Sequence, residues 1–290
     1  MIRLLALDLD GTVLNSRGEI PDENRTAIRS AEERGVLVTI ATGRRFRDAR
    51  PVGLDLELNA PLITHNGALL KYAQTLVTVE ADLISTETSL EIIRVGKRFG
   101  GDAFVSVDPS GPGTLIYDRV SDENEPLRRY LQWATTLHGD DAQEAVIHVE
   151  RLEDEIGKHD VIHVSFSGTC ERMYDMQRFL EEELDDTVTI LATIYPTRDF
   201  TLLDILPPNS SKGSGLEKLA AIRRIDREDV MAIGDNFNDI EMLEFAGTSI
   251  VMGNADPSLL ERDEFYTTVS NDECGVSAAI GQFILKQENV

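Results

Sequence analysis

The stretch LLALDLDGTVL, residues 4–14, decides how the rest of the chain is interpreted. Its apolar residues predict a buried strand that ends at an Asp-Gly turn signal. Two carboxylates, Asp8 and Asp10, interrupt the apolar run at the point where the strand ends. Two negative charges at the end of a core strand require a functional reason as well as a structural one.

Strand and helix patterns alternate after this stretch. Residues 21–35, PDENRTAIRSAEERG, predict a helix, with Pro near its start and Gly at its end. Residues 36–44 (VLVTIATGR) and 60–70 (APLITHNGALL) each predict a further strand. A strand, a helix and a strand joined by short connections predict a parallel sheet with right-handed crossovers.

The rhythm changes at about residue 84, where helical patterns mix with short strand patterns typical of an α+β module. Near Phe200 the first rhythm returns, and FTLLDILP predicts one more strand of the sheet. We therefore expect an α/β fold, a doubly wound, Rossmann-like parallel sheet built from residues 1–83 and 198–290. An inserted α+β cap domain is expected over residues 84–197.

The composition excludes several classes of function. The chain has 290 residues, is 41% hydrophobic and carries a formal charge of −24, which argues against binding nucleic acid or an anionic membrane. No apolar run reaches the ~18 residues of a membrane helix, so a cytoplasmic protein is expected. Cys170 and Cys274 form no pairing or metal-ligand pattern. The acidity, with few lysines, fits either ordinary solubility or a salt-rich cytoplasm.

Polar residues of unusual type follow the predicted strands. In open parallel sheets, ligands bind beyond the carboxyl ends of the strands, so these residues are expected to meet at one edge. They are Asp8 and Asp10, the run Thr42-Gly43-Arg44, Lys212 at a helix start, and Asp235, Asn238 and Asp239.

Each group alone has a structural explanation: a turn, a strand end, a helix cap or an Asx turn. Lys212 is an exception, because a cation is unfavourable at the positive end of a helix dipole unless an anion binds there as well. Carboxylates gathered at one edge repel one another unless a cation lies between them, and their hard oxygen donors favour Mg²⁺. A hydroxyl, backbone amides and a lysine are the groups that hold phosphoryl oxygens.

These residue types predict a phosphoryl-transfer site. One carboxylate can attack phosphorus directly, and a second, two residues along the strand, points to the same face. The second can protonate the leaving oxygen and then take a proton from the water that cleaves the aspartyl-phosphate. Asp8 and Asp10 are therefore interpreted as a nucleophile and its acid–base partner.

The same residues, in this order, resemble the haloacid dehalogenase-like hydrolases. DLDGT, Thr42 of ATGR, Lys212 and GDNFND are similar to that family's four motifs. The long insertion resembles the class IIB cap of the Cof-type subfamily. The stretches THNGA (64–68), GNA (253–255) and VSNDECGV near the C-terminus add to the likeness.

The resemblance implies a role for each matching residue. Asp8 is expected to be the nucleophile and a Mg²⁺ ligand, and Asp10 the general acid/base that binds the metal through its backbone carbonyl. Asp235 is expected to be the third ligand, whereas Asp239 orients a water near the metal. The phosphoryl group is assigned to Leu9, Thr42, Gly43, Lys212 and Asn238. Asn66 either contacts the substrate near the cap or serves a turn.

The function expected from this resemblance is Mg²⁺-dependent hydrolysis of small phosphomonoesters, such as sugar phosphates or phosphoglycolate-like metabolites. A phosphomutase or phosphotransferase acting on sugar phosphates is an alternative, because it would use the same aspartyl-phosphate. A non-catalytic sugar-phosphate sensor is a second alternative, although every expected catalytic residue is present. The sequence leaves the substrate and the oligomeric state open.

Overall fold

The computed structural model describes residues 1–122, 124–195 and 199–286 and divides the chain into two compact units. The first unit contains Met1–Arg44, Ala49–Val79 and the chain from Ser211 onward. The second contains Arg45–Asp48 and Glu80–Ser210. The expected domain boundary between residues 197 and 198 lies outside the described residues.

The first unit is built around a five-stranded sheet in the order β14-β13-β12-β1-β2. Every pairing in it is parallel, as the sequence predicts. Leu7 at the end of β1 is in register with Ile40 of β2 and Ile233 of β12, so the carboxyl ends of these strands lie together. The strands are β1 (Leu4–Leu7), β2 (Leu37–Ile40), β12 (Val230–Gly234), β13 (Thr248–Val251) and β14 (Tyr266–Thr267).

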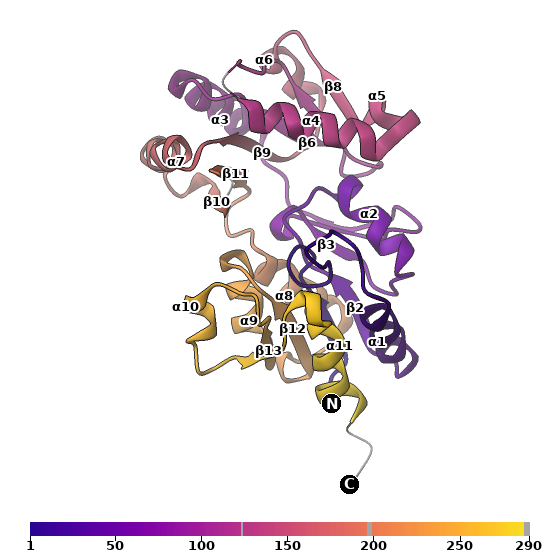
Figure 1. The fold of residues 1–290 in the computed structure, drawn as a ribbon. Helices are drawn as coiled ribbons and strands as arrows, with labels where there is room; N and C mark the ends of the chain where they lie inside the picture. The colour runs from indigo at the N-terminus through magenta and orange to yellow at the C-terminus, as the bar shows by residue number, and fades with distance from the viewer. Residues whose placement is uncertain (123, 196–198, 287–290) are drawn as a thin grey trace. The chain divides into compact units, whose positions relative to one another are not determined.

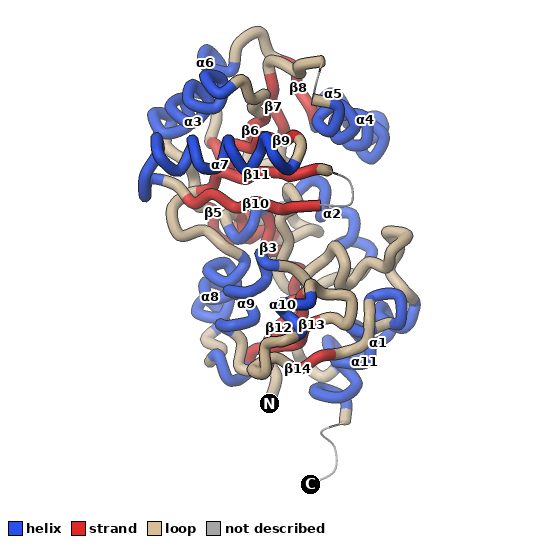
Figure 2. Tube along the Cα trace, turned by 60° about the vertical axis from the view of Figure 1, so that its left-hand side comes forward, coloured by secondary structure: helices blue, strands red, loops and turns tan. Residues whose placement is uncertain are grey.

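Helices cover both faces of this sheet, which confirms the doubly wound arrangement. Helices α8 and α9 lie on one side of β12 and β13, and α1 and α11 lie on the other (Figures 1 and 2). Leu216 and Met242 bury their side chains with Leu4 and Ala6 of β1. The helices are α1 (Asp22–Glu33), α8 (Lys212–Arg223), α9 (Ile240–Phe245), α10 (Pro257–Leu260) and α11 (Gly275–Ile280), and α2 (Phe46–Asp55) begins in the second unit.

The stretch 60–70, which the pattern predicts to be one strand of the parallel sheet, forms two short strands instead. They are β3 (Leu62–Thr64) and β4 (Leu69–Lys71), which pair antiparallel and form a separate sheet with β5 (Thr78–Ala81). Positive φ angles at Asn66 (49°) and Gly67 (94°) reverse the chain between them. An isolated parallel bridge between Ala41 and Ile63 links β3 to the end of β2.

The second unit is the α+β module expected from the middle of the sequence. Its six-stranded sheet has the order β10-β11-β9-β6-β7-β8, and every pairing is antiparallel except β7 with β8. The strands are β6 (Phe104–Val107), β7 (Thr114–Tyr117), β8 (Val146–His148), β9 (Val161–Gly168), β10 (Thr189–Tyr195) and β11 (Phe200–Leu206).

Two helices bury one face of this second sheet. Helix α3 contributes Ile92 and Ile93 to the core there, and α7 contributes Met173 and Leu180. Helix α4 packs Leu127 against Phe104 on the other face. None of the helices in the described part of the chain is long and apolar enough to cross a membrane. The helices are α3 (Thr86–Phe99), α4 (Glu125–His138), α5 (Ala142–Ala145), α6 (Leu152–Glu155) and α7 (Cys170–Leu184).

Strand β11 lies in a different sheet from the one that the sequence rhythm predicts. FTLLDIL was expected in the parallel sheet, but it pairs antiparallel with β9 and β10. Its Leu203 and Ile205 join the hydrophobic core of the second unit, and Asp204 on the opposite face accepts a hydrogen bond from Ser165 at 2.7 Å. A short apolar run predicts a strand but carries no information about which sheet it joins.

Candidate active site

A buried lysine between two buried carboxylates is the centre of the candidate site. Lys212 Nζ lies 2.6 Å from Asp8 Oδ1 and 2.6 Å from Asp239 Oδ1. Asp8 directly follows β1, Lys212 opens α8, and Asp239 precedes α9. All three side chains are buried. The first unit therefore brings Asp8 together with Lys212 and Asp239, two residues that follow it by more than two hundred positions.

A third carboxylate, Asp235, lies beside them. Asp8, Asp235 and Asp239 each offer one oxygen, and these oxygens all lie within 4.8 Å of one another. Asp235 Oδ1 accepts a hydrogen bond from Thr12 Oγ1 at 3.1 Å. Asp239 Oδ2 accepts from the backbone N–H groups of Asp235 and Asn236 at 3.0 Å each. Both oxygens of Asp239 therefore have donors within the protein, which holds its carboxylate in a fixed orientation.

The electrostatics of this group favour an added cation. Burial raises the pKa of Asp8 well above its ordinary value, with Lys212 opposing and Asp239 adding to the rise. Burial and then Asp239 raise the pKa of Asp235 to about 7. Burial alone would lower the pKa of Lys212, but Asp239 and Asp8 together raise it, so the lysine stays charged. One lysine does not offset three carboxylates in a buried site.

The donor set fits Mg²⁺. Hard cations of this size prefer carboxylate oxygens and keep part of their coordination for water or a phosphate. Asp8 and Asp235 would hold the ion, and Asp239, already engaged by Lys212 and two backbone amides, would hold the surrounding groups in place.

Asp10 lies outside this group of carboxylates, with half of its side chain exposed. Its oxygens accept hydrogen bonds from Arg44 Nε at 2.8 Å and Nη2 at 2.5 Å. Leu9 between the two acids is fully buried. Gly11 has a φ of +87°, and a Cβ there would lie 2.3 Å from Asp235 Oδ2, so only glycine fits beside that carboxylate.

Thr42 and Gly43, the predicted phosphate-binding residues that follow β2, lie next to Asn66. Thr42 N–H donates to Ile63 O at 2.9 Å, and Asn66 N–H donates to Thr42 O at 3.1 Å. Asn238 Nδ2 donates to Asn66 Oδ1 at 3.2 Å, and a Cβ on Gly43 would lie 3.0 Å from the same oxygen. Asn66 is fully buried and links the Thr42 loop to the Asn238 loop.

Several residues that shape this site have no role predicted from the sequence. Thr12 and Arg44 are two of them, although both belong to quoted motifs. Asn254 Nδ2 donates to Gly11 O at 2.9 Å, and its Oδ1 accepts from Asn271 N–H at 2.8 Å. These asparagines fix the loop that follows β1. The signal was present in the GNA and VSND stretches, but the partners of an asparagine cannot be read from a motif.

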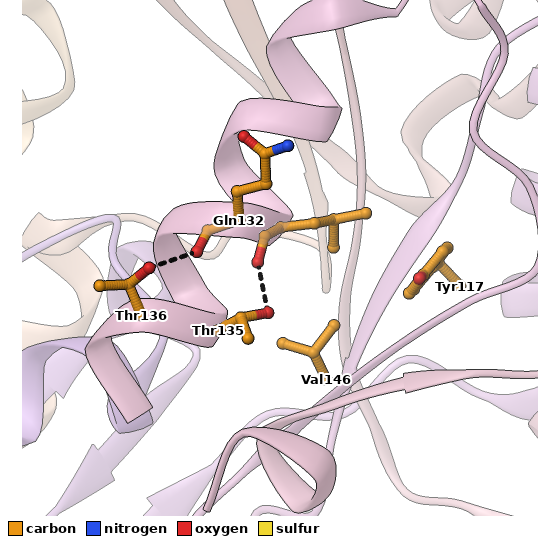
Figure 3. Close-up of a pocket in the computed structure, with 6 residues that line it drawn as sticks. Tyr117, Gln132, Thr135, Thr136 and Val146 are labelled. Atoms are coloured by element: carbon orange, nitrogen blue, oxygen red, sulfur yellow. Dashed lines mark hydrogen bonds between the residues drawn. The ribbon is translucent and has the colours of Figure 1, made fainter. Parts of the chain in front are cut away.

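A pocket in the second unit involves none of the predicted residues. It has a volume of about 440 Å³ and is lined by Tyr117, Leu131, Gln132, Thr135, Thr136 and Val146 (Figure 3). The hydroxyls of Thr135 and Thr136 donate to carbonyls one turn earlier in α4, at 2.8 and 3.0 Å. The residues that line it include no charged group, so nothing in it matches a phosphate or a metal ion.

Several known proteins are similar to this chain. The family model of the haloacid dehalogenase-like hydrolases matches residues 5–280. The 5-amino-6-(5-phospho-D-ribitylamino)uracil phosphatase YwtE of Bacillus subtilis is 32% identical over 99% of each chain. The pyridoxal phosphate phosphatase YbhA of Escherichia coli is 30% identical, over 90% of this chain and 91% of its own. A solved structure of the subclass IIB sugar phosphatase BT4131, from the haloacid dehalogenase (HAD) superfamily, shares the fold with a TM-score of 0.74 at 22% identity, over 97% of this chain and 98% of that one.

Proposed function

Because the chain belongs to the haloacid dehalogenase-like hydrolases, we propose that it is a Mg²⁺-dependent phosphatase that hydrolyses small phosphomonoesters through an aspartyl-phosphate. Phosphoric monoester hydrolysis is the reaction class named for its relatives YwtE and YbhA. The observation that carries the proposal is the position of Asp8, a buried carboxylate at a strand end that shares a lysine with Asp239 and lies beside Asp235.

The reaction divides into two steps. In the first, an Asp8 oxygen attacks phosphorus, the ester P–O bond breaks, and Asp10 gives a proton to the leaving oxygen. In the second, water attacks the phosphorus of the aspartyl-phosphate while Asp10 accepts a proton from that water. The bond between phosphorus and the Asp8 oxygen then breaks, which releases phosphate and restores the carboxylate.

The surrounding groups hold the phosphoryl oxygens. Lys212 supplies a positive charge that burial cannot remove, since two carboxylates keep it protonated. The hydroxyl of Thr42, the backbone N–H groups of Gly43 and Leu9, and the Asn238 amide are assigned as further donors. When bound at Asp8 and Asp235, with the Asp10 carbonyl as a further ligand, Mg²⁺ supplies charge neutralisation for the phosphoryl group.

The substrate is a small phosphorylated metabolite. YwtE and YbhA are named for two chemically different phosphomonoesters, so the shared feature of the substrates is the phosphate. We assign catalysis to the first unit and substrate selection to the second, the cap, with sugar phosphates and phosphoglycolate-like esters as the first compounds to test. Two free cysteines, Cys170 and Cys274, support a reducing, cytoplasmic setting.

Asp8→Asn tests this proposal. We expect the wild-type protein to release phosphate from members of a metabolite panel with Mg²⁺ and to stop in EDTA. The variant should lose at least about 10⁴-fold in kcat, the scale of removing a nucleophile, while its circular dichroism spectrum stays unchanged. Asp263→Asn, an exposed acid in the same unit, is the matched control and should retain full turnover. Turnover retained by Asp8→Asn would refute the nucleophile assignment.

A further inference from the structure

The guanidinium of Arg44 donates two hydrogen bonds to the carboxylate of Asp10. Arg44 Nε and Nη2 donate to separate oxygens of Asp10, at 2.8 and 2.5 Å, which is the fork geometry that fixes both the position and the plane of a carboxylate. Asp10 is in turn the residue that has to exchange protons with the substrate and with water. Its orientation therefore depends on a residue to which the reaction scheme gives no task.

Arg44 itself is attached to a fixed part of the first unit. Its backbone N–H donates to Thr42 Oγ1 at 3.1 Å, and its carbonyl accepts from His65 N–H at 3.0 Å. Both partners lie in the loops at the ends of β2 and β3. The guanidinium thus reaches Asp10 from the loop that is assigned to the phosphate, and it links the loop after β1 to the loop after β2.

The pair contributes little to folding. The Asp10 side chain is 50% exposed and that of Arg44 is 27% exposed, and ion pairs this open to solvent add little to stability. An ion pair that has fork geometry but adds little to the stability of the fold is expected where the orientation of the carboxylate matters more than the strength of the pair.

We propose that Arg44 is a positioning residue for Asp10, an inference that rests on the proposed function. One hydrogen bond of the fork opens so that one Asp10 oxygen can exchange a proton, and the other bond keeps the carboxylate aimed at the reacting atoms. The proton moves between that oxygen and the leaving oxygen or the attacking water, as in the two steps above. Arg44 itself gains and loses no proton.

Steady-state and stopped-flow kinetics with p-nitrophenyl phosphate test the assignment. Nitrophenolate leaves without a proton, so the first step does not need Asp10 as an acid. Arg44→Ala should therefore release a burst of about one nitrophenolate per enzyme, and the rate of this burst should be near that of the first step in the wild type. Steady-state kcat should then fall about 10- to 100-fold, part of the 10²–10⁴ that general acid–base catalysis contributes. KM should fall by a similar factor, because kcat/KM reports the first step alone and that step is unchanged. Arg44→Lys, which keeps the charge without the fork, should recover part of the loss.

Arg25→Ala is the matched control. Arg25 pairs with Asp55 at 2.9 Å, with side-chain exposures of 33% and 55% that are close to those of the Arg44 pair, so its loss should leave kcat and KM unchanged. The assignment is overturned if Arg44→Ala behaves like this control or if KM rises at constant kcat. It is also overturned if the burst slows together with turnover, because Arg44 would then act on the phosphoryl group.

A readout independent of turnover separates this assignment from the proposed function. If the wild-type protein releases no phosphate from any ester, the proposed phosphatase function is refuted, but the pairing of Arg44 with Asp10 is not yet tested by that result. The Arg44 Nε–H resonance, assigned by its loss in Arg44→Lys, then decides the pairing. Its displacement in Asp10→Asn supports the fork, and an unmoved resonance overturns it.

Discussion

Asp48 shows how one side chain can hold several elements together. Its carboxylate accepts hydrogen bonds from Arg45 Nε and Nη2 at 2.8 and 2.9 Å and from Tyr130 Oη at 3.1 Å. His138 Nε2 lies 2.9 Å from the same group. Burial would raise the pKa of Asp48, but Arg45 and His138 more than offset it and hold that pKa well below its usual range. The start of α2 is thereby fixed to α4 within the second unit.

We expect Asp48→Asn to lower the free energy of unfolding by about 3–5 kcal/mol at pH 7, because it leaves the buried Arg45 without a carboxylate. The folded pKa of Asp48 lies below its unfolded value of about 3.9, so the stabilisation is present above that value. It is lost as the pH falls from there toward the folded pKa. Urea unfolding of both proteins at pH 7, 5 and 3 measures the difference, which should narrow at pH 3.

Asp122→Asn is the control for this pH series. Asp122 is fully exposed and lies 3.7 Å from Arg128, so its replacement should change the unfolding free energy by less than about 1 kcal/mol at every pH. A wild-type minus Asp48→Asn difference that stays constant from pH 7 to pH 3 would show that the carboxylate charge does not stabilise the fold.

At the scale of single residues, the sequence predicts where a side chain lies better than it predicts which way the side chain points. Asp8 and Asp235 follow neighbouring parallel strands, so their proximity follows from the sheet alone. The rotation of Asp10 toward Arg44, and the approach of Tyr130 and His138 of α4 to Asp48, depend on loops whose course is set by tertiary packing. No spacing rule carries that information.

A close approach between a turn and a helix places Lys212. The turn His65–Gly67 packs on the first turn of α8, and a Cβ on Gly67 would lie 1.9 Å from Ser211 O. On the helix side, a Cβ on Gly215 would lie 2.6 Å from Ile63 Cγ2 and 2.9 Å from Gly67 Cα. Two glycines facing each other allow α8 to begin beside β3, and Gly215 lies within one helical turn of Lys212.

Gly215→Ala is expected to displace the first turn of α8. Alanine favours a helix over glycine by about 1 kcal/mol, but the overlap with Gly67 backbone should outweigh this and lower the melting temperature. Because the displaced turn carries Lys212, turnover should fall by tenfold or more at temperatures where the variant is still folded. Thermal unfolding and phosphate release together measure both effects.

Gly281→Ala provides the comparison, since a Cβ there would meet nothing within 4 Å and its φ of −55° is helical. It should leave turnover unchanged and melting temperature equal or slightly higher. If Gly215→Ala gave the same result, the packing of α8 on the turn would be too loose to position the lysine.

The elements themselves were predicted from sequence where periodicity and end signals agreed. Helix α1 begins after Pro21 and ends before Gly35, as the pattern indicates. The pairing of β11 with β9, and the reversal between β3 and β4, were missed for related reasons. Seven apolar-rich residues predict a strand but not its neighbour, and the positive φ angle at Asn66 is a conformation that sequence alone does not assign.

On the scale of the whole chain, the dominant electrostatic quantity is the net charge. The chain has 52 acidic and 28 basic residues. At 10 mM salt the Debye length is about 30 Å, so repulsion acts across an entire unit, whereas at 1 M it falls to about 3 Å. Exposed ion pairs such as Arg262–Glu244, at 2.7 Å, also weaken in salt, but each contributes only about 0–1 kcal/mol. Relief of repulsion should therefore exceed the loss of pairs.

We expect the melting temperature at pH 7.5, in EDTA, to rise by several degrees between 10 mM and 1 M KCl. Most of the rise should occur below about 0.15 M, where the Debye length has already shortened to about 8 Å. Sodium and lithium chloride should act alike, because screening depends on ionic strength. The same series at pH 5, near the isoelectric point of about 4.5, should show a much smaller rise. A rise that begins only above 0.5 M, or that is as large at pH 5, would instead indicate salt exclusion from the protein surface. A melting temperature that does not change with salt at pH 7.5 would show that repulsion among the excess acidic residues does not destabilise the fold.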